Sequence, residues 1–227
     1  MESISAKNQR TKMQSIEAFF NDFDKKAGYL VDLYNSDHRD EARILCSCYI
    51  DGLASALYWP DHNSNFNYVK SLMEHGGNAI FSHIHPKMLD DAFHRLVKRG
   101  SKKWSAIHGK ISGELRRADR RLYGKREIVD LITSLLQTSE IAIANRELWR
   151  GTFAAIVYER FRIAAVHRFG PPDGTTFDGS TFQGEPVPAI DFFMVHDCLN
   201  KIIGVARESS QKTGKLFGHD YECTDHE

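Results

Sequence analysis

Residues 15–34 read SIEAFFNDFDKKAGYLVDLY. Their apolar side chains recur at steps of three and four positions, which is the spacing of one face of an α-helix. These positions are Ile16, Phe19, Phe20, Phe23, Ala27, Leu30, Val31 and Tyr34. The segment therefore predicts an amphipathic helix.

The same spacing recurs along most of the remaining chain. It predicts helices over residues 37–58, 66–74, 86–98, 107–124, 128–136, 147–167 and 188–207. Asp37 is placed to cap the first of these. Between the last two helices, Asp178-Gly179 lies between β-favouring residues, a pattern typical of a hairpin.

We therefore predict an all-α fold, an antiparallel helical bundle with a small β-hairpin or loop before the last helix. The chain is expected to form a single domain, residues 1–227, with a helical insertion at about residues 60–105. Residues 209–227 are polar and are expected to form a flexible tail.

Composition places the chain among globular proteins. Its 227 residues are 41% hydrophobic and 26% charged. Lys and Arg together number 30 and Asp and Glu number 30, so the net charge is zero, and bulk positive charge cannot hold it to nucleic acid. No run of 18 apolar residues and no apolar leader occurs, so we expect a cytoplasmic protein without a membrane span.

The charge is unevenly distributed, however. Residues 95–126 hold twelve Lys and Arg side chains against only Glu114 and Asp119. A polyanion, an acidic partner or intramolecular pairing could each relieve this local excess, and Asp22, Asp24 and Asp32 are candidates for the last. Arg117, Arg120 and Arg121 are expected on one helix face. For an RNA surface, the candidates are Lys102, Lys103, Arg116, Arg117, Arg120 and Arg121.

The motif with the clearest chemistry is YERFRIAAVH, residues 158–167, at the expected end of a helix. His167 lies where the negative end of the helix dipole favours its protonated form. Such a histidine is suited to proton transfer in RNA cleavage, and Arg162 offers donors that match a phosphate. Glu159 is a candidate orienting group, and this chemistry needs no metal or other cofactor.

An R-x4-H sequence near the end of the penultimate helix of an all-α chain resembles the HEPN superfamily. The resemblance covers residues 150–205 and, more loosely, 15–60. It implies a helical bundle, commonly a homodimer, and for many members metal-independent ribonuclease activity in toxin–antitoxin, CRISPR or anti-phage systems. Arg162 matches the family's arginine and His167 its histidine, so RNA and an antitoxin or defence-system protein are the implied partners.

Two positions depart from the family pattern. Active members usually carry Asn, Asp or His directly after the arginine, where this chain has Ile163. In the subgroup regulated by tyrosine modification the motif extends to R-x4-H-x-Y, and Phe169 holds the tyrosine's place. The first departure supports an alternative function, a non-catalytic HEPN-like helical module that scaffolds protein or nucleic-acid assembly.

The spacing of the motif constrains its geometry. Five residues along an ideal α-helix rotate the side chain by about 140° from its starting direction, so Arg162 and His167 do not share a narrow face. They can converge if the helix unwinds towards Gly170, or if a second copy supplies one partner across a two-fold axis. The second option predicts a site at a homodimer interface.

Other chemistry receives less support. His75, His83, His85 and His94 crowd one stretch near Glu74, Asp90 and Asp91, but their spacing matches no recognised metal motif, and we expect no metal. His108 is expected to be a surface histidine. No P-loop, G-x-S-x-G or dinucleotide-binding pattern occurs.

Overall fold

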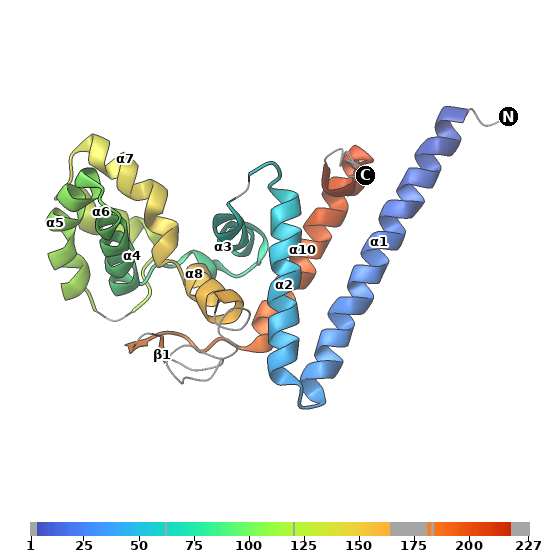
Figure 1. The fold of residues 1–227 in the computed structure, drawn as a ribbon, viewed down its shortest axis with the longest axis horizontal. Coiled ribbons are helices and arrows are strands. Elements are labelled where there is room, and N and C mark those ends of the chain that lie inside the picture. Colours follow the sequence, from blue (N-terminus) through green and yellow to red (C-terminus); the bar gives the residue numbers. More distant parts are fainter. Residues whose placement is uncertain (1–3, 62, 120, 164–180, 183, 219–227) are drawn as a thin grey trace. The chain divides into compact units, whose positions relative to one another are not determined.

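The computed structural model describes residues 4–61, 63–119, 121–163, 181–182 and 184–218 (Figure 1). Helices dominate these residues, so the predicted all-α fold is confirmed. The chain divides into two compact units. Unit 1 comprises Met1–Gly77 and Phe192–Glu227, and unit 2 comprises Asn78–Asp191. The single-domain organisation with an insertion at about residues 60–105 stays a prediction.

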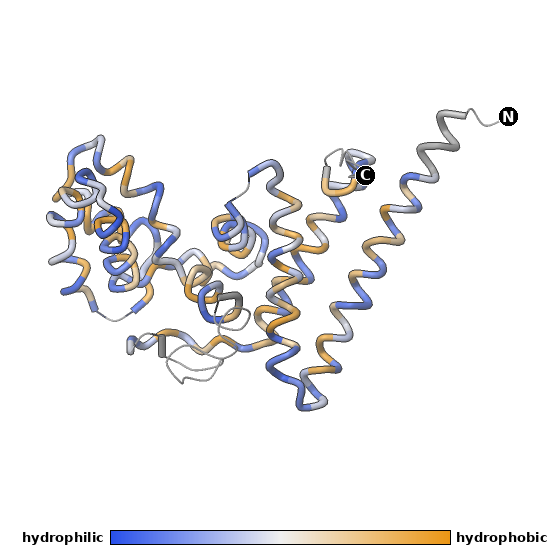
Figure 2. Tube along the Cα trace, viewed as in Figure 1, coloured by the Kyte–Doolittle hydropathy of each residue, from blue (hydrophilic) through white to orange (hydrophobic). Residues whose placement is uncertain are grey.

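Unit 1 is a bundle of long helices. Its elements are α1 (Ile4–Asn35), α2 (Arg39–Leu57), α3 (Ser64–His75), α10 (Phe192–Thr213) and the 3₁₀ turn η5 (Leu216–Gly218). Helices α1, α2 and α10 pack against one another. Figure 2 shows hydrophilic and hydrophobic residues alternating along each of them, as their sequence spacing predicts. Their apolar faces bury Phe20, Leu30, Ile50, Leu53, Leu199 and Ile202.

The ends of these helices differ from the predictions. Asp37 does not cap α2; it lies in a turn with a φ of 64°, and His38 takes the cap position without a side-chain hydrogen bond. Helix α10 begins at Phe192 and continues to Thr213, into the end expected to be a flexible tail. Beyond it, the backbone N–H of Phe217 donates to Ser210 Oγ at 2.7 Å, and Phe217 is buried.

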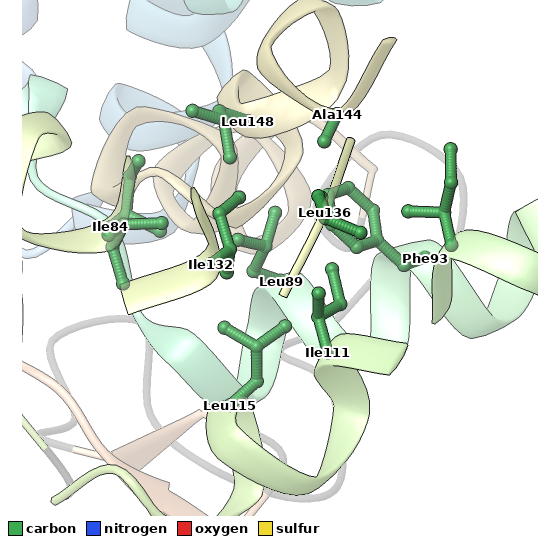
Figure 3. Packing of buried hydrophobic residues seen from close by; sticks show 11 residues of the cluster. Ile84, Leu89, Phe93, Ile111, Leu115, Ile132, Leu136, Ala144 and Leu148 are labelled. Carbon is green, nitrogen blue, oxygen red and sulfur yellow. The ribbon is translucent and has the colours of Figure 1, made fainter. Parts of the chain in front are cut away.

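Unit 2 consists of shorter helices joined by tight turns. They are η1 (Ala79–Ser82), α4 (Pro86–Lys98), α5 (Lys102–Arg117), α6 (Lys125–Thr133), α7 (Thr138–Glu147), η2 (Leu148–Gly151), α8 (Phe153–Val157) and the π-helix η3 (Tyr158–Ile163). Figure 3 shows how side chains from several of them point towards one another to form the core of the unit. Leu89 and Phe93 come from α4, Ile111 and Leu115 from α5, and Ile132 from α6.

Local hydrogen bonds explain where several of these helices begin. Pro86 occupies the first turn of α4, where its missing N–H costs nothing. Ser101 Oγ accepts from the backbone N–H of Trp104 at the start of α5. Glu127 and Glu140 accept from the backbone N–H groups of Gly124 and Gln137 at the starts of α6 and α7.

Three predicted helices of unit 2 are wrong in extent, and the one expected over residues 128–136 is observed at Lys125–Thr133. The helix expected over residues 107–124 ends at Arg117, because the chain then turns so that Tyr123 pairs with Ile84 through two backbone hydrogen bonds of 2.7 and 2.8 Å. The helix expected over residues 147–167 is broken, since residues 148–151 form a 3₁₀ turn before α8. A Cβ at Gly151 would lie 2.7 Å from Leu89 Cβ, so only glycine fits this close approach to α4.

A short hairpin precedes α10, at other residues than the predicted one. Strand β1 (Thr181–Phe182) pairs antiparallel with β2 (Glu185–Pro186), with Phe182 opposite Glu185. The predicted turn at Asp178-Gly179 lies outside the described residues.

Candidate functional site

The helix that carries Arg162 starts from a fixed and buried point. Thr152 Oγ1 accepts from the backbone N–H of Ala155 at 3.2 Å and so caps α8. Every residue of α8 is buried, and Phe153 stacks on Phe81 with ring centroids 6.0 Å apart. The segment leading to the motif is therefore held on all sides.

At Tyr158 the helix widens into the π-helix η3, which runs to Ile163. Hydrogen bonds in a π-helix join residues five apart, whereas those of an α-helix join residues four apart. A turn of η3 therefore takes more residues, and two positions five apart lie closer to one face than they do in an α-helix. The ideal α-helical geometry assumed for the motif does not apply from Tyr158 to Ile163.

The three charged side chains of η3 have different environments. Glu159 is partly exposed, and its Oε1 lies 3.5 Å from Nη2 of Arg95 on α4. Arg160 is fully buried. Arg162 lies on the described backbone of η3, but its side chain and the whole of His167 lie outside the described residues, so their pairing stays a prediction.

The basic residues after the middle of α5 are largely paired within unit 2. Arg117 Nη1 lies 2.7 Å from Glu114 Oε1, and Arg121 contacts both Asp119 and Glu127 at 3.2 Å. Arg117 ends α5, so the expected face of Arg117, Arg120 and Arg121 on one helix does not form. Arg120 lies outside the described residues.

Arg116 belongs to a network around a buried carboxylate. Asp90 on α4 is 1% exposed, and its Oδ2 accepts from Arg116 Nε at 2.7 Å. Its Oδ1 lies 2.8 Å from Nε2 of His108, which is buried, so the expected surface position of His108 is wrong. Burial by itself raises the pKa of Asp90, but hydrogen bonds from Arg116, Ser112 and His108 outweigh it and lower that pKa below its ordinary value.

This network borders a cavity of about 420 Å³ in unit 2. Its wall includes Asp90 and Arg116 on one side, together with Lys87 of α4 and Glu185 of β2, which form an ion pair. This ion pair could not be predicted from the sequence, because residues 98 positions apart give no periodic pattern that would join them.

The α4–α5 turn contrasts with the paired region. Lys102 and Lys103 are exposed in the first turn of α5, and Lys98 and Arg99 are exposed just before it. Within the described parts of the chain, none of these four side chains forms an ion pair. Of the five predicted RNA-binding residues that the structure describes, Lys102 and Lys103 are thus the two whose charge is not matched by a described carboxylate.

Two of the three acidic residues proposed for intramolecular pairing have other partners. Asp22 pairs with Lys26 at 2.8 Å, and Asp24 accepts from Arg207 at 2.5 Å, all within unit 1. The carboxylates that do pair with the basic segment are neighbours of it in unit 2.

The four candidate metal-binding histidines do not converge. His75 stacks on Tyr58, while His83 Nδ1 lies 2.8 Å from the carbonyl oxygen of Ala79. His85 is buried beside the cavity, and the His94 ring lies 5.6 Å from that of His108. Over the described residues, no three His, Cys, Asp or Glu side chains are grouped so that they could hold a metal ion.

Two further searches concern the chain as a whole. None of the described helices is both long enough and apolar enough to cross a membrane. Comparisons of the sequence and fold with protein-family models, with curated proteins and with solved structures find no match.

Proposed function

We propose that this protein is a metal-independent endoribonuclease of the HEPN type, with Arg162 and His167 as its catalytic pair. The observation that carries the proposal is the π-helix at residues 158–163, which contains Arg162. Segments of π-helix are rare, and they occur frequently at functional sites. Here the π-helix η3 directly follows α8, whose residues are all buried, so it interrupts a closely packed segment.

The chemistry follows from the two side chains. The ribose 2′-oxygen attacks the adjacent phosphorus while the bond from phosphorus to the 5′-oxygen breaks, which leaves a 2′,3′-cyclic phosphate and a 5′-hydroxyl. His167 takes the proton from the 2′-OH or gives one to the departing 5′-oxygen. Arg162 binds the phosphate and stabilises the charge that develops on it, and Glu159 orients the site.

The wider setting belongs to the same proposal. A homodimer would let one copy supply Arg162 and the other His167 across a two-fold axis. The protein would act in the cytoplasm, with an antitoxin or another defence-system protein as its partner. The exposed Lys102 and Lys103 support a basic surface that guides RNA to the site.

The test is cleavage of a mixed-sequence RNA by the purified full chain in EDTA. We expect cleavage that yields cyclic phosphate ends, and losses of at least a hundredfold in Arg162→Ala and His167→Ala. Matched controls are Arg146→Ala and His38→Ala, which change exposed residues of the same types and should leave the rate unchanged. Cleavage that His167→Ala leaves untouched would overturn the proposed site.

One residue favours a second function. Ile163 stands where active members usually carry a polar residue, which suits a non-catalytic helical module that scaffolds protein or nucleic-acid assembly. RNA binding without cleavage in EDTA, together with a loss of assembly in Arg162→Ala, would select this alternative.

A further inference from the structure

The turn between α4 and α5 concentrates positive charge. Four of its six residues are exposed cations, and together we call them the turn cluster: Lys98, Arg99, Lys102 and Lys103. The sequence contains no Asp or Glu between Asp91 and Glu114. Gly100, with a φ of 85°, reverses the chain between the two pairs and so places both next to one short turn.

The positions of Lys102 and Lys103 are unfavourable for the isolated protein. Both lie in the first turn of α5, where the helix dipole contributes positive potential and stabilises negative side chains. Helices α6 and α7 of the same unit follow that rule, with Glu127 and Glu140 in their first turns. Helix α5, like α4, has no acidic residue there, and an anion bound at this turn would offset the charge of the two lysines.

The aromatic side chains of the basic segment do not offer a platform for bases. The Trp104 ring packs on Phe93 with centroids 4.8 Å apart, and the Tyr123 ring is covered by the guanidinium of Arg121 at 4.0 Å. Among the described residues of unit 2, the only large apolar side chain that is exposed is Leu135. Leu135 belongs neither to α4 nor to α5. A protein partner would need an apolar centre to its interface, which the turn does not provide.

We propose that the turn cluster binds the phosphates of RNA, without reading its bases. This inference rests on the proposed function for the identity of the polyanion. Three of the four side chains are lysines, which contact phosphates as mobile point charges. Binding through phosphates alone is insensitive to sequence and strongly sensitive to salt.

The first measurement is fluorescence anisotropy of the full chain with a labelled 2′-O-methyl oligouridine of 20 nucleotides. The methyl group blocks the 2′-oxygen nucleophile, so binding is measured separately from cleavage. Four phosphate contacts to a single strand give a slope of about −3 for log affinity against log salt. A 2′-O-methyl oligoadenosine of the same length should bind within about threefold, because no base is read.

The decisive variant is Lys102→Glu/Lys103→Glu. We expect a loss of affinity of at least tenfold at low salt, with the slope flattened by about 1.4 for the two lost contacts. The matched control is Lys125→Glu/Arg126→Glu, which makes the same charge change at the first two positions of α6. That start follows the far end of α5, whose 16 residues extend about 24 Å. The control should change affinity less than twofold.

Several outcomes would overturn the inference. Equal losses of RNA affinity in the two double variants would show that binding depends on overall charge and not on this turn. A flat salt response would show that phosphates are not the ligand. Phosphatidylserine vesicles or an acidic polypeptide bound through this turn, with no RNA bound, would assign it to another partner. Cleavage that fails while this binding persists would overturn only the catalytic proposal, and cleavage that persists without this binding would overturn only the turn cluster.

Discussion

The α4–α5 turn and the segment from Arg116 to Glu127 are equally basic in sequence, but the fold treats them differently. In the later segment, Arg116 and Arg121 each contact carboxylates, and one of these, Asp90, is almost completely buried. At the turn, the exposed cations meet no described carboxylate, and two of them lie at a helix start that disfavours positive charge. The segment from Arg116 to Glu127 contributes to stability, and the α4–α5 turn is left available for a ligand.

This difference shows that local net charge does not measure the charge that a ligand can reach. The charge of a guanidinium that contacts a buried carboxylate is already neutralised. Removing that contact lowers the stability of the fold. An exposed lysine without a counter-ion carries its full charge to the surface. Variants that separate stability from RNA affinity test whether the two regions differ in this way.

The largest effect on stability is expected for Asp90→Asn. The substitution removes the charge that His108 and Arg116 contact, at a position that is 1% exposed. We expect a loss of about 2 kcal/mol in the free energy of unfolding, measured by urea denaturation. Asp91→Asn is the matched control, since that carboxylate is partly exposed and should change the free energy by less than about 0.5 kcal/mol. Equal effects of the two substitutions would show that the network around Asp90 does not stabilise the fold.

The pH dependence of stability provides the next test. The pKa of Asp90 is lower in the folded protein than its ordinary value of 3.8, since hydrogen bonds from Arg116, Ser112 and His108 outweigh its burial. Its contribution is therefore complete above about pH 4 and is lost as the pH falls through the lowered folded pKa. Wild type should lose more stability than Asp90→Asn between pH 5 and pH 2, in denaturation at each pH. Parallel curves would contradict this assignment, because other acidic groups titrate equally in both proteins.

Apolar spacing predicted most of the helices but not where they end. Residues 86–98 were predicted exactly, because Pro86 marks the start and the stripe through Leu89 and Phe93 faces the core. The end of α5 at Arg117 was missed, since the backbone pairing of Tyr123 with Ile84 depends on a contact between distant residues. The π-helix was missed for a related reason, because its widened turn leaves the sequence pattern of an ordinary helix intact.

The candidate site was predictable only in part. The basic sequence around Lys102 and Lys103 indicates a surface turn, and the structure shows both side chains exposed there. Their binding of RNA stays a prediction. The pairing of Arg116 with Asp90 and the burial of His108 were not predicted, because both depend on a carboxylate about twenty residues earlier in the chain. Tertiary contacts decide which cations are paired with a carboxylate in the fold. A count of charges along the sequence does not reveal those contacts.

A smaller effect, of opposite sign, is expected at the turn. Lys102→Glu places a negative charge at the first position of α5, where it interacts favourably with the helix dipole. The variant should gain about 0.5 kcal/mol in stability while it loses RNA affinity. Urea denaturation and anisotropy on one preparation would measure both. Lys102→Gln is the control for charge removal alone and should lie between wild type and Lys102→Glu in each measurement.

The smallest effect is expected for Arg117→Gln, and it tests where the boundary between the two regions lies. The Arg117 side chain is 77% exposed, and its partner Glu114 is one helical turn away. Such a pair contributes a few tenths of a kcal/mol, and relief of repulsion from neighbouring cations offsets part of that. Stability and RNA affinity should therefore both stay near wild type, in the same two assays. A clear loss of affinity would show that an arginine in a surface ion pair is still available to RNA. The segment from Arg116 to Glu127 would then differ from the turn only where the carboxylate is buried, as at Asp90.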